Sequence, residues 1–125
     1  MKKNKDSVEF VEVSSAERNR IQEIIAAART LDWEKFVTLT DLPFPNLDSM
    51  REQFDEAAPI VAAVSEPVTL QQISAITRDD GQRQISADID TNGATRLPIV
   101  ISLCSSDNGP NPTITITVFL KQFFW

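Results

Sequence analysis

The sequence predicts an α+β fold, with three N-terminal helices packed on one face of a curved four-stranded antiparallel meander. In the first half of the chain, apolar residues recur at three- and four-residue intervals, as on the buried side of a helix. From Val68 onward, apolar and polar residues alternate, as along strands with one buried face. The pairs Asp80-Gly81 and Asn92-Gly93 separate the alternating runs and are typical of hairpin turns.

The length of 125 residues fits one domain. We assign residues 14–125 to a single α+β domain. Residues 1–13 form either a mobile arm or a short edge strand, because their apolar residues alternate only imperfectly with polar ones.

The first helix is predicted to begin at Ser14 and to run for about 17 residues. Ser14 and Glu17 have the spacing of a capping box, in which the side chain of each residue accepts the backbone N–H of the other. The apolar stripe of this helix consists of Ile21, Ile24, Ile25, Ala28 and Leu31.

Asp32 is predicted to cap a second, shorter helix that ends before Pro43 and Pro45. A third helix follows, and Pro59 lies inside its pattern. We therefore expect either a kink or a further short helix that begins at Pro59. The stripe of the third helix consists of Leu47, Met50, Phe54, Ala57, Ala58, Val61 and Val64.

The four strands are expected at about 68–78, 82–91, 96–105 and 113–123. Gln71-Gln72 breaks the alternation of the first strand and predicts a bulge.

The connection at Asn92-Gly93 is predicted to be a three-residue loop that begins at Thr91. This loop would pair Ala87 with Leu97 and Ile85 with Ile99, so that apolar residues share one face. Asp107-Asn108-Gly109-Pro110 is predicted to be a turn.

The register divides the sheet into two faces. The face toward the helices is predicted to carry Ile85, Ala87, Ile89, Leu97, Ile99, Ile101, Leu103, Ile114, Ile116, Val118 and Leu120. The outer face is mixed, with Gln84, Ser86, Asp88, Val100, Ser102, Cys104, Thr115, Thr117, Phe119 and Lys121.

Helices followed by a curved antiparallel meander resemble the NTF2-like (cystatin-like α+β roll) superfamily. The stretch 21–36, with Thr30-Leu31-Asp32-Trp33-Glu34 at the end of the long helix, is similar to the openings of many members. The resemblance implies a concave pocket between sheet and helices, and often a dimer through the outer sheet face. Members usually place a strand between the second and third helices, and only residues 36–42 could supply it here.

The composition limits the chemistry. The chain has no histidine and no tyrosine, and Cys104 is its only cysteine. These absences exclude histidine-based triads, histidine-ligated metals and an internal disulfide. The superfamily includes isomerases, dehydratases and members that only bind, and its enzymes commonly use His, Tyr and Asp in the pocket. We expect no cofactor and no metal site.

The net charge of −6 and the pI of about 4.6 disfavour binding to nucleic acid, and the single basic cluster, at residues 2–5, lacks interleaved aromatic residues. The sequence has neither a membrane-spanning apolar run nor a signal-peptide core, so a cytoplasmic location is expected.

Two groups of residues are candidates for binding. A pocket for a small apolar ligand could be lined by Trp33, Phe36, Phe44, Met50 and Phe54. A dimer or partner interface on the outer face could contain Val100, Phe119, Phe123, Phe124 and Trp125.

Two further features are predicted to have no catalytic or metal-binding role. Asp88 and Asp90 share a strand face and could act as an acid–base pair or hold a cation, but acidic residues on an outward face usually serve solubility. Cys104 is expected to be inert, with Lys121 as the one neighbouring cation that the pattern suggests.

The residues favour a non-catalytic module, dimeric, that binds a small apolar ligand or a protein partner. One alternative is an isomerase or hydrolase-type enzyme that uses a pocket carboxylate such as Asp32, Asp41 or Asp88. Another is an acidic inhibitor or immunity-type protein that covers a basic partner surface.

Overall fold

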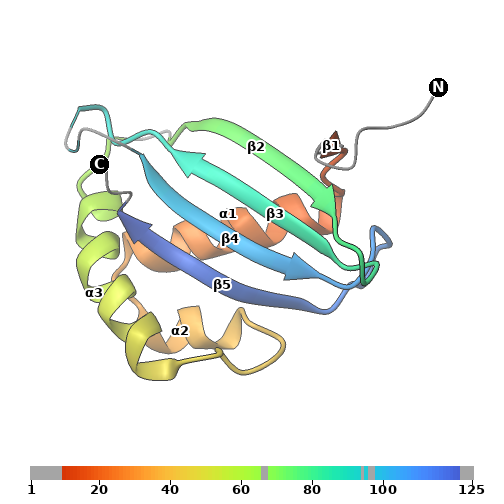
Figure 1. The fold of residues 1–125 in the computed structure, drawn as a ribbon. Helices are drawn as coiled ribbons and strands as arrows, with labels where there is room; N and C mark the ends of the chain where they lie inside the picture. Colours follow the sequence, from red (N-terminus) through yellow and green to blue (C-terminus); the bar gives the residue numbers. More distant parts are fainter. Residues whose placement is uncertain (1–9, 66–67, 94, 96–97, 122–125) are drawn as a thin grey trace.

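The computed structural model of the chain describes residues 10–65, 68–93, 95 and 98–121. The elements are β1 (Phe10–Val11), α1 (Ser15–Arg29), α2 (Trp33–Thr38), α3 (Leu47–Ala62), β2 (Leu70–Thr77), β3 (Arg83–Ile89), β4 (Ile99–Ser105) and β5 (Ile114–Lys121). The strands form one antiparallel sheet in the order β1-β2-β3-β4-β5. The three helices lie on one side of this sheet, and its other face is turned toward the viewer without a helix over it (Figure 1).

The predicted fold class is confirmed, with a fifth strand added at the edge. Phe10 pairs with Ile76 and Val11 pairs with Ala75, so β1 extends the sheet beyond β2. Of the two alternatives for the N-terminal segment, a mobile arm or an edge strand, these two residues form a strand. Residues 1–9 lie outside the described part.

Helix α1 begins with the predicted capping box. The Ser14 hydroxyl accepts the Glu17 N–H at 3.2 Å, and the Glu17 carboxylate accepts the Ser14 N–H at 2.9 Å.

The end of α1 differs from the predicted stripe at Leu31. The Leu31 N–H donates to the Ala28 carbonyl and the Asp32 N–H donates to the Ala27 carbonyl, as in a Schellman motif. Leu31 occupies the position where glycine is usual, with a φ of 55°, and its side chain is 55% exposed. It therefore ends the helix and contributes little to the core.

The Asp32 carboxylate caps α2 by accepting the Lys35 N–H at 3.0 Å, as predicted. Helix α3 begins at the cap Asn46 and continues as one element through Pro59, so no second helix starts there. The segment between α2 and α3 contains no strand, although members of the resembled superfamily usually have one there.

The first hairpin contains the predicted bulge. Leu70 pairs with Ile89 and Gln72 pairs with Asp88, which leaves Gln71 as the extra residue. At the other end of the hairpin Gly81 has a φ of 86°, and its N–H donates to the Arg78 carbonyl at 2.9 Å.

The register predicted between the second and third strands of the meander is wrong by four residues. Ala87 pairs with Ile101 and Ile85 pairs with Leu103, so the connection runs from Asp90 to Pro98. Pro98 has no N–H to donate to a ladder, and β4 begins directly after it. Because four is an even shift, the predicted faces are unchanged for the residues of β3 and β4, while Leu97 lies outside the described part of the chain.

The predicted faces of the last strand are wrong beyond Thr117. Ser102 pairs with Val118 whereas Leu103 pairs with Ile116, so Thr117 is an extra residue in a bulge. One inserted residue turns every later side chain to the opposite face. Val118 and Leu120 consequently point outward, while Phe119 points toward the helices and is fully buried.

The core lies between the sheet and the helices. Its fully buried members include Ile21, Ile24, Ala28, Phe36, Val61, Ile85, Ile89, Ile99, Ile101, Leu103, Ile116 and Phe119. They come from α1, α2, α3 and three strands, so burial of this apolar surface holds the two layers together.

Candidate functional site

The residues predicted to line an internal pocket do come together, but they pack against one another. The Phe36 ring lies 5.7 Å from that of Trp33, 4.9 Å from that of Phe54 and 5.8 Å from that of Phe44, measured between centroids. Phe119, which was predicted at the outer face, is 5.4 Å from Phe36. These rings pack against one another between the sheet and the helices, where the resemblance implied a cavity.

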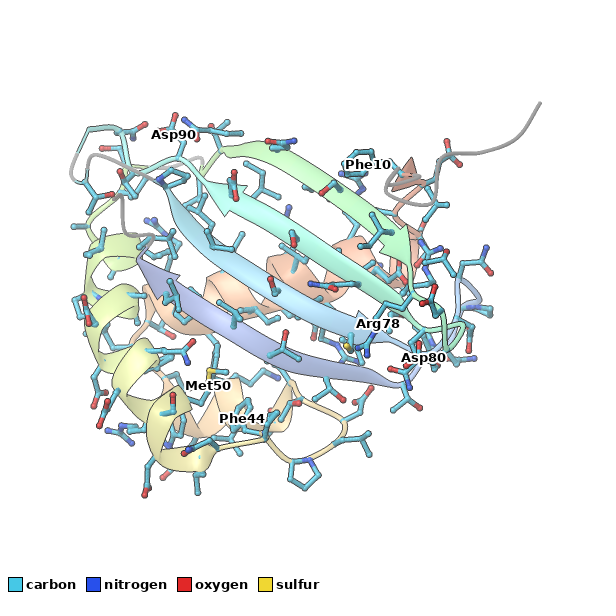
Figure 2. All side chains as sticks on the ribbon, viewed as in Figure 1. Phe10, Phe44, Met50, Arg78, Asp80 and Asp90 are labelled. Atoms are coloured by element: carbon cyan, nitrogen blue, oxygen red, sulfur yellow. The ribbon has the colours of Figure 1, made fainter. Side chains whose placement is uncertain are left out.

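Among the described residues, an open pocket lies beside the loop between α2 and α3. It has a volume of about 390 Å³ and is lined by Val37, Thr40, Asp41, Pro43, Phe44 and Leu47. Of the five predicted pocket residues only Phe44 contributes to it (Figure 2). Leu42 and Leu47 beside it are more than half exposed, at 54% and 56%.

The same loop covers the free edge of β5. The Asp41 carboxylate accepts the Ile114 N–H at 2.8 Å, and the Thr40 hydroxyl accepts the Ile116 N–H at 3.0 Å. The Gln53 side chain on α3 accepts the Phe119 N–H at 2.8 Å. Unpaired edge groups are a template for another strand, and these side chains occupy them.

Two of the candidate catalytic carboxylates therefore have structural partners. Asp32 caps α2, and Asp41 binds the Ile114 N–H and lies 3.3 Å from the Arg20 guanidinium. The third candidate, Asp88, lies on the outer face.

The outer face is the sheet surface opposite the helices. The pairing registers assign to it Phe10, Gln72, Ser74, Ile76, Gln84, Ser86, Asp88, Val100, Ser102, Cys104, Thr115, Val118 and Leu120. Of these residues only Asp88 is charged, although 24% of the chain is charged. Phe10 at its margin is 65% exposed (Figure 2).

The centre of the outer face is formed by small polar side chains. Ser86 and Ser102 are cross-strand partners, and their hydroxyl oxygens lie 3.4 Å apart. Ser102 is only 8% exposed even though no helix covers it.

Arg78 lies at the hairpin end of the outer face. Its guanidinium reaches over the sheet to Cys104, with 3.5 Å from Nη1 to Sγ, and its other nitrogen lies 3.5 Å from the Asp80 carboxylate. Arg78 is thus a cation beside Cys104. The sequence suggested Lys121 for this place, but the backbone of Lys121 pairs with Ile99, at the other end of β4 from Cys104. Alternation along β2 from Ser74 through Ile76 could have placed Arg78 on this face.

Asp88 lies toward the opposite end of the outer face. Burial raises the pKa of its carboxyl above the ordinary value of 3.8, and none of the hydrogen bonds or ion pairs among the described residues compensates it. Asp90 is near in sequence, but its carboxylate accepts the Asn92 N–H at 2.9 Å and so shapes the turn. Figure 2 places Arg78 and Asp90 at opposite ends of the sheet.

A buried ion pair joins α1 to the face of the sheet that the helices cover. The Arg83 guanidinium donates to both Glu17 oxygens, at 2.7 and 3.0 Å, and also to the Glu12 carbonyl. Burial opposes ionisation of Glu17, but hydrogen bonds from Arg83, Ser14 and Ser105 outweigh it and hold the pKa of Glu17 below 4.5. This pair is structural, because both carboxylate oxygens have partners and Glu17 is fully buried.

Three of the predicted interface residues, Phe123, Phe124 and Trp125, lie outside the described part of the chain. A search of the described residues finds no group of three or more His, Cys, Asp or Glu side chains arranged to hold a metal ion. None of the helices described is long and apolar enough to cross a membrane.

The fold and this surface define an α+β architecture in which three helices cover one face of an antiparallel sheet and none of the described helices covers the other. Comparison with known proteins adds no relative: no family model matches the chain, and no curated protein or solved structure matches it significantly.

Proposed function

We propose that this chain is a non-catalytic NTF2-like module that assembles through its outer sheet face. The order of three helices and then a meander supports the family assignment, and the absence of a strand in the segment between α2 and α3 is a departure from it. The low number of charged side chains on the outer face carries the functional proposal.

An antiparallel sheet that faces water on one side usually places polar and charged side chains there. Protein interfaces show the opposite composition at their centres, where charged residues are depleted and aromatic residues enriched. The paired positions of the outer face include one charged residue, Asp88, and an exposed aromatic residue, Phe10, at the margin. In its small number of charged side chains, this face resembles the centre of an interface more than a hydrated surface.

The covered edge of β5 supports assembly through the face. Asp41, Thr40 and Gln53 occupy the backbone N–H groups to which a further strand would bind. A partner that binds near β5 would therefore contact the outer face of the sheet and not the edge of this strand.

Sedimentation velocity on wild type and on Ser86→Arg tests this proposal. Ser86 is at the centre of the outer face, so a long cation there should abolish self-association at total concentrations of about 5 to 200 µM. Gln22→Arg adds the same charge at an exposed position of α1 and should leave association unchanged. Equal association of both variants and wild type would contradict the proposal.

The pocket beside the α2–α3 loop favours a second candidate function, the binding of a small apolar ligand. Its lining is mostly apolar, and its volume of about 390 Å³ lies in the range of small-molecule sites. Fluorescence titration with 1-anilinonaphthalene-8-sulfonate should give saturable binding that Val37→Arg removes and Gln22→Arg retains. Equal dye binding by all three proteins would show that this pocket is not the site.

A further inference from the structure

The outer face is ordered in rows that run across the strands. One row contains Gln84 and Cys104, the next contains Ser86 and Ser102, and the third contains Asp88 and Val100. The guanidinium of Arg78 bonds to Cys104 and so lies near the first row. The Arg78 guanidinium, which also lies 3.5 Å from the Asp80 carboxylate, is therefore on one side of the serine row, and the Asp88 carboxylate is on the other.

We propose that a second copy of this chain occupies the outer face with its strands antiparallel to those of the first, so that Arg78 of each copy meets Asp88 of the other. This inference rests on the proposed function and adds the relative orientation of the two copies and the residues that meet across the interface. The two-fold axis would lie between the two sheets, over the row that contains Ser86 and Ser102. Rotation about it brings the row of Cys104 over the row of Asp88 in the second copy.

A two-fold axis fixes the same patch on both copies, so a self-complementary pattern is required. The antiparallel arrangement supplies it, because it superposes the end carrying Arg78 on the end carrying Asp88 in both halves of the interface. An axis parallel to the strands would instead bring Arg78 near Arg78 and Asp88 near Asp88. Like charges facing each other in an interface are strongly unfavourable, so the charge pattern selects the antiparallel orientation.

The surroundings of Asp88 also fit a cationic partner. Its carboxyl is partly desolvated and has no compensating group among the described residues, whereas Arg78 is exposed, with 46% of its side chain accessible. The contact would pair Asp88 with a cation from the second copy.

The dimensions of the face predict a small interface. The four longer strands lie about 4.8 Å apart and have seven or eight residues each; at about 3.3 Å per residue they span about 19 by 25 Å. Such an area is at the low end for specific complexes, so the dimer should dissociate in the micromolar range.

Charge reversal tests the orientation by sedimentation velocity. Arg78→Glu alone places two carboxylates together at each contact, and Asp88→Arg alone places two guanidinium groups together. Each variant should weaken its homodimer by about tenfold or more. Arg18→Glu, at an exposed site on α1, makes the same charge change as Arg78→Glu and should associate as wild type does.

Mixing the two variants provides the decisive result. In the mixed dimer, one contact joins the glutamate substituted at position 78 of one copy to the arginine substituted at position 88 of the other. The second contact keeps the wild-type pair of Arg78 and Asp88. Both contacts are then attractive, so an equimolar mixture of R78E and D88R should dimerise within about threefold of wild type. The double variant R78E/D88R should also dimerise.

The outcomes separate this inference from the proposed function. Loss of dimer in Ser86→Arg without any effect of the single reversals would retain the outer face and overturn the antiparallel pairing. Weak dimerisation of both single variants that is not restored in their mixture would overturn the antiparallel pairing as well, provided that thermal melting shows both variants folded.

If a variant is unfolded, Arg78→Gln and Asp88→Asn replace the reversals and should each weaken the dimer several-fold. A monomeric wild type throughout the concentration range would overturn the second copy as the occupant.

Discussion

The two sides of the sheet each contain a carboxylate with reduced access to water: Glu17 is fully buried and Asp88 is partly buried, and the surroundings of the two groups differ. Glu17 lies between α1 and the sheet and receives both donors of the Arg83 guanidinium. Asp88 lies on the outer face and has no such partner among the described residues. The pKa of Glu17 is accordingly lowered, and burial raises the pKa of Asp88.

This difference separates structural from candidate functional residues. A buried carboxylate with paired oxygens contributes to the specific packing of two elements. A partly buried carboxylate without a partner reduces stability, and residues of this kind concentrate at sites of binding or catalysis. Asp88 lies on the outer face and has no partner among the described residues. It is therefore the residue to which a binding partner should contribute a cation.

The largest expected effect comes from removing one member of the inner pair. Arg83→Met leaves Glu17 buried without its cation and should lower the free energy of unfolding by about 3 to 5 kcal/mol. Urea unfolding at neutral pH measures this loss. The double variant Glu17→Met/Arg83→Met removes both charges and should recover much of it, because apolar residues of similar size can replace a buried pair. A loss below about 1 kcal/mol in Arg83→Met would mean that the pair does not hold α1 against the sheet.

The sequence contains the main elements of the fold but not the bulge of β5. The capping box of Ser14 and Glu17, the bulge at Gln71 and the faces of β3 and β4 follow from local spacing. Thr117 gives no local signal of a bulge, because the alternation of Ile114, Ile116 and Val118 continues through it. Packing decides its position, since the bulge turns Phe119 into the ring cluster with Phe36.

The candidate site was predictable only in part for the same physical reason. Val100 could be assigned to the outer face from the period of its strand, whereas the contact of Arg78 with Cys104 depends on where a long side chain reaches across the sheet. The pair of Glu17 and Arg83 joins residues 66 positions apart, and no local pattern connects them.

The free energy of unfolding should depend on pH through both carboxylates. The ionised Glu17 carboxylate stabilises the fold, whereas the ionised Asp88 carboxylate destabilises it. The folded pKa of Glu17 lies below 4.5, so its contribution is complete above that value and is lost as the pH falls through the folded pKa. The pKa of Asp88 in the folded chain lies above 3.8. Its ionised carboxylate therefore lowers the free energy of unfolding by the full amount above the folded pKa, and this loss disappears below pH 3.8. Urea unfolding from neutral pH to about pH 3 measures both as differences between wild type and a variant.

For Glu17, the stability difference between wild type and the double methionine variant should decrease as the solution becomes acidic. For Asp88, the difference between Asp88→Asn and wild type should also decrease, but there the variant is the more stable protein at neutral pH. A pH-independent difference in either comparison would show that the corresponding carboxyl titrates alike in the folded and unfolded chains.

The smallest expected effect is a gain from Asp88→Asn. Asparagine keeps the size of the side chain and removes the desolvated charge, so the monomer should gain about 0.5 to 1 kcal/mol at neutral pH, a small value because water still screens the partly exposed group. Unfolding must be measured at a concentration below dimer dissociation, because in the dimer the same substitution removes the proposed contact with Arg78. Asp90→Asn is the matched control on the same strand end: its side-chain oxygen can still accept the Asn92 N–H, so stability should change little. A loss of monomer stability in Asp88→Asn would show that Asp88 has a favourable partner within its own chain. The outer face would then have no unpaired carboxylate for a second copy to bind.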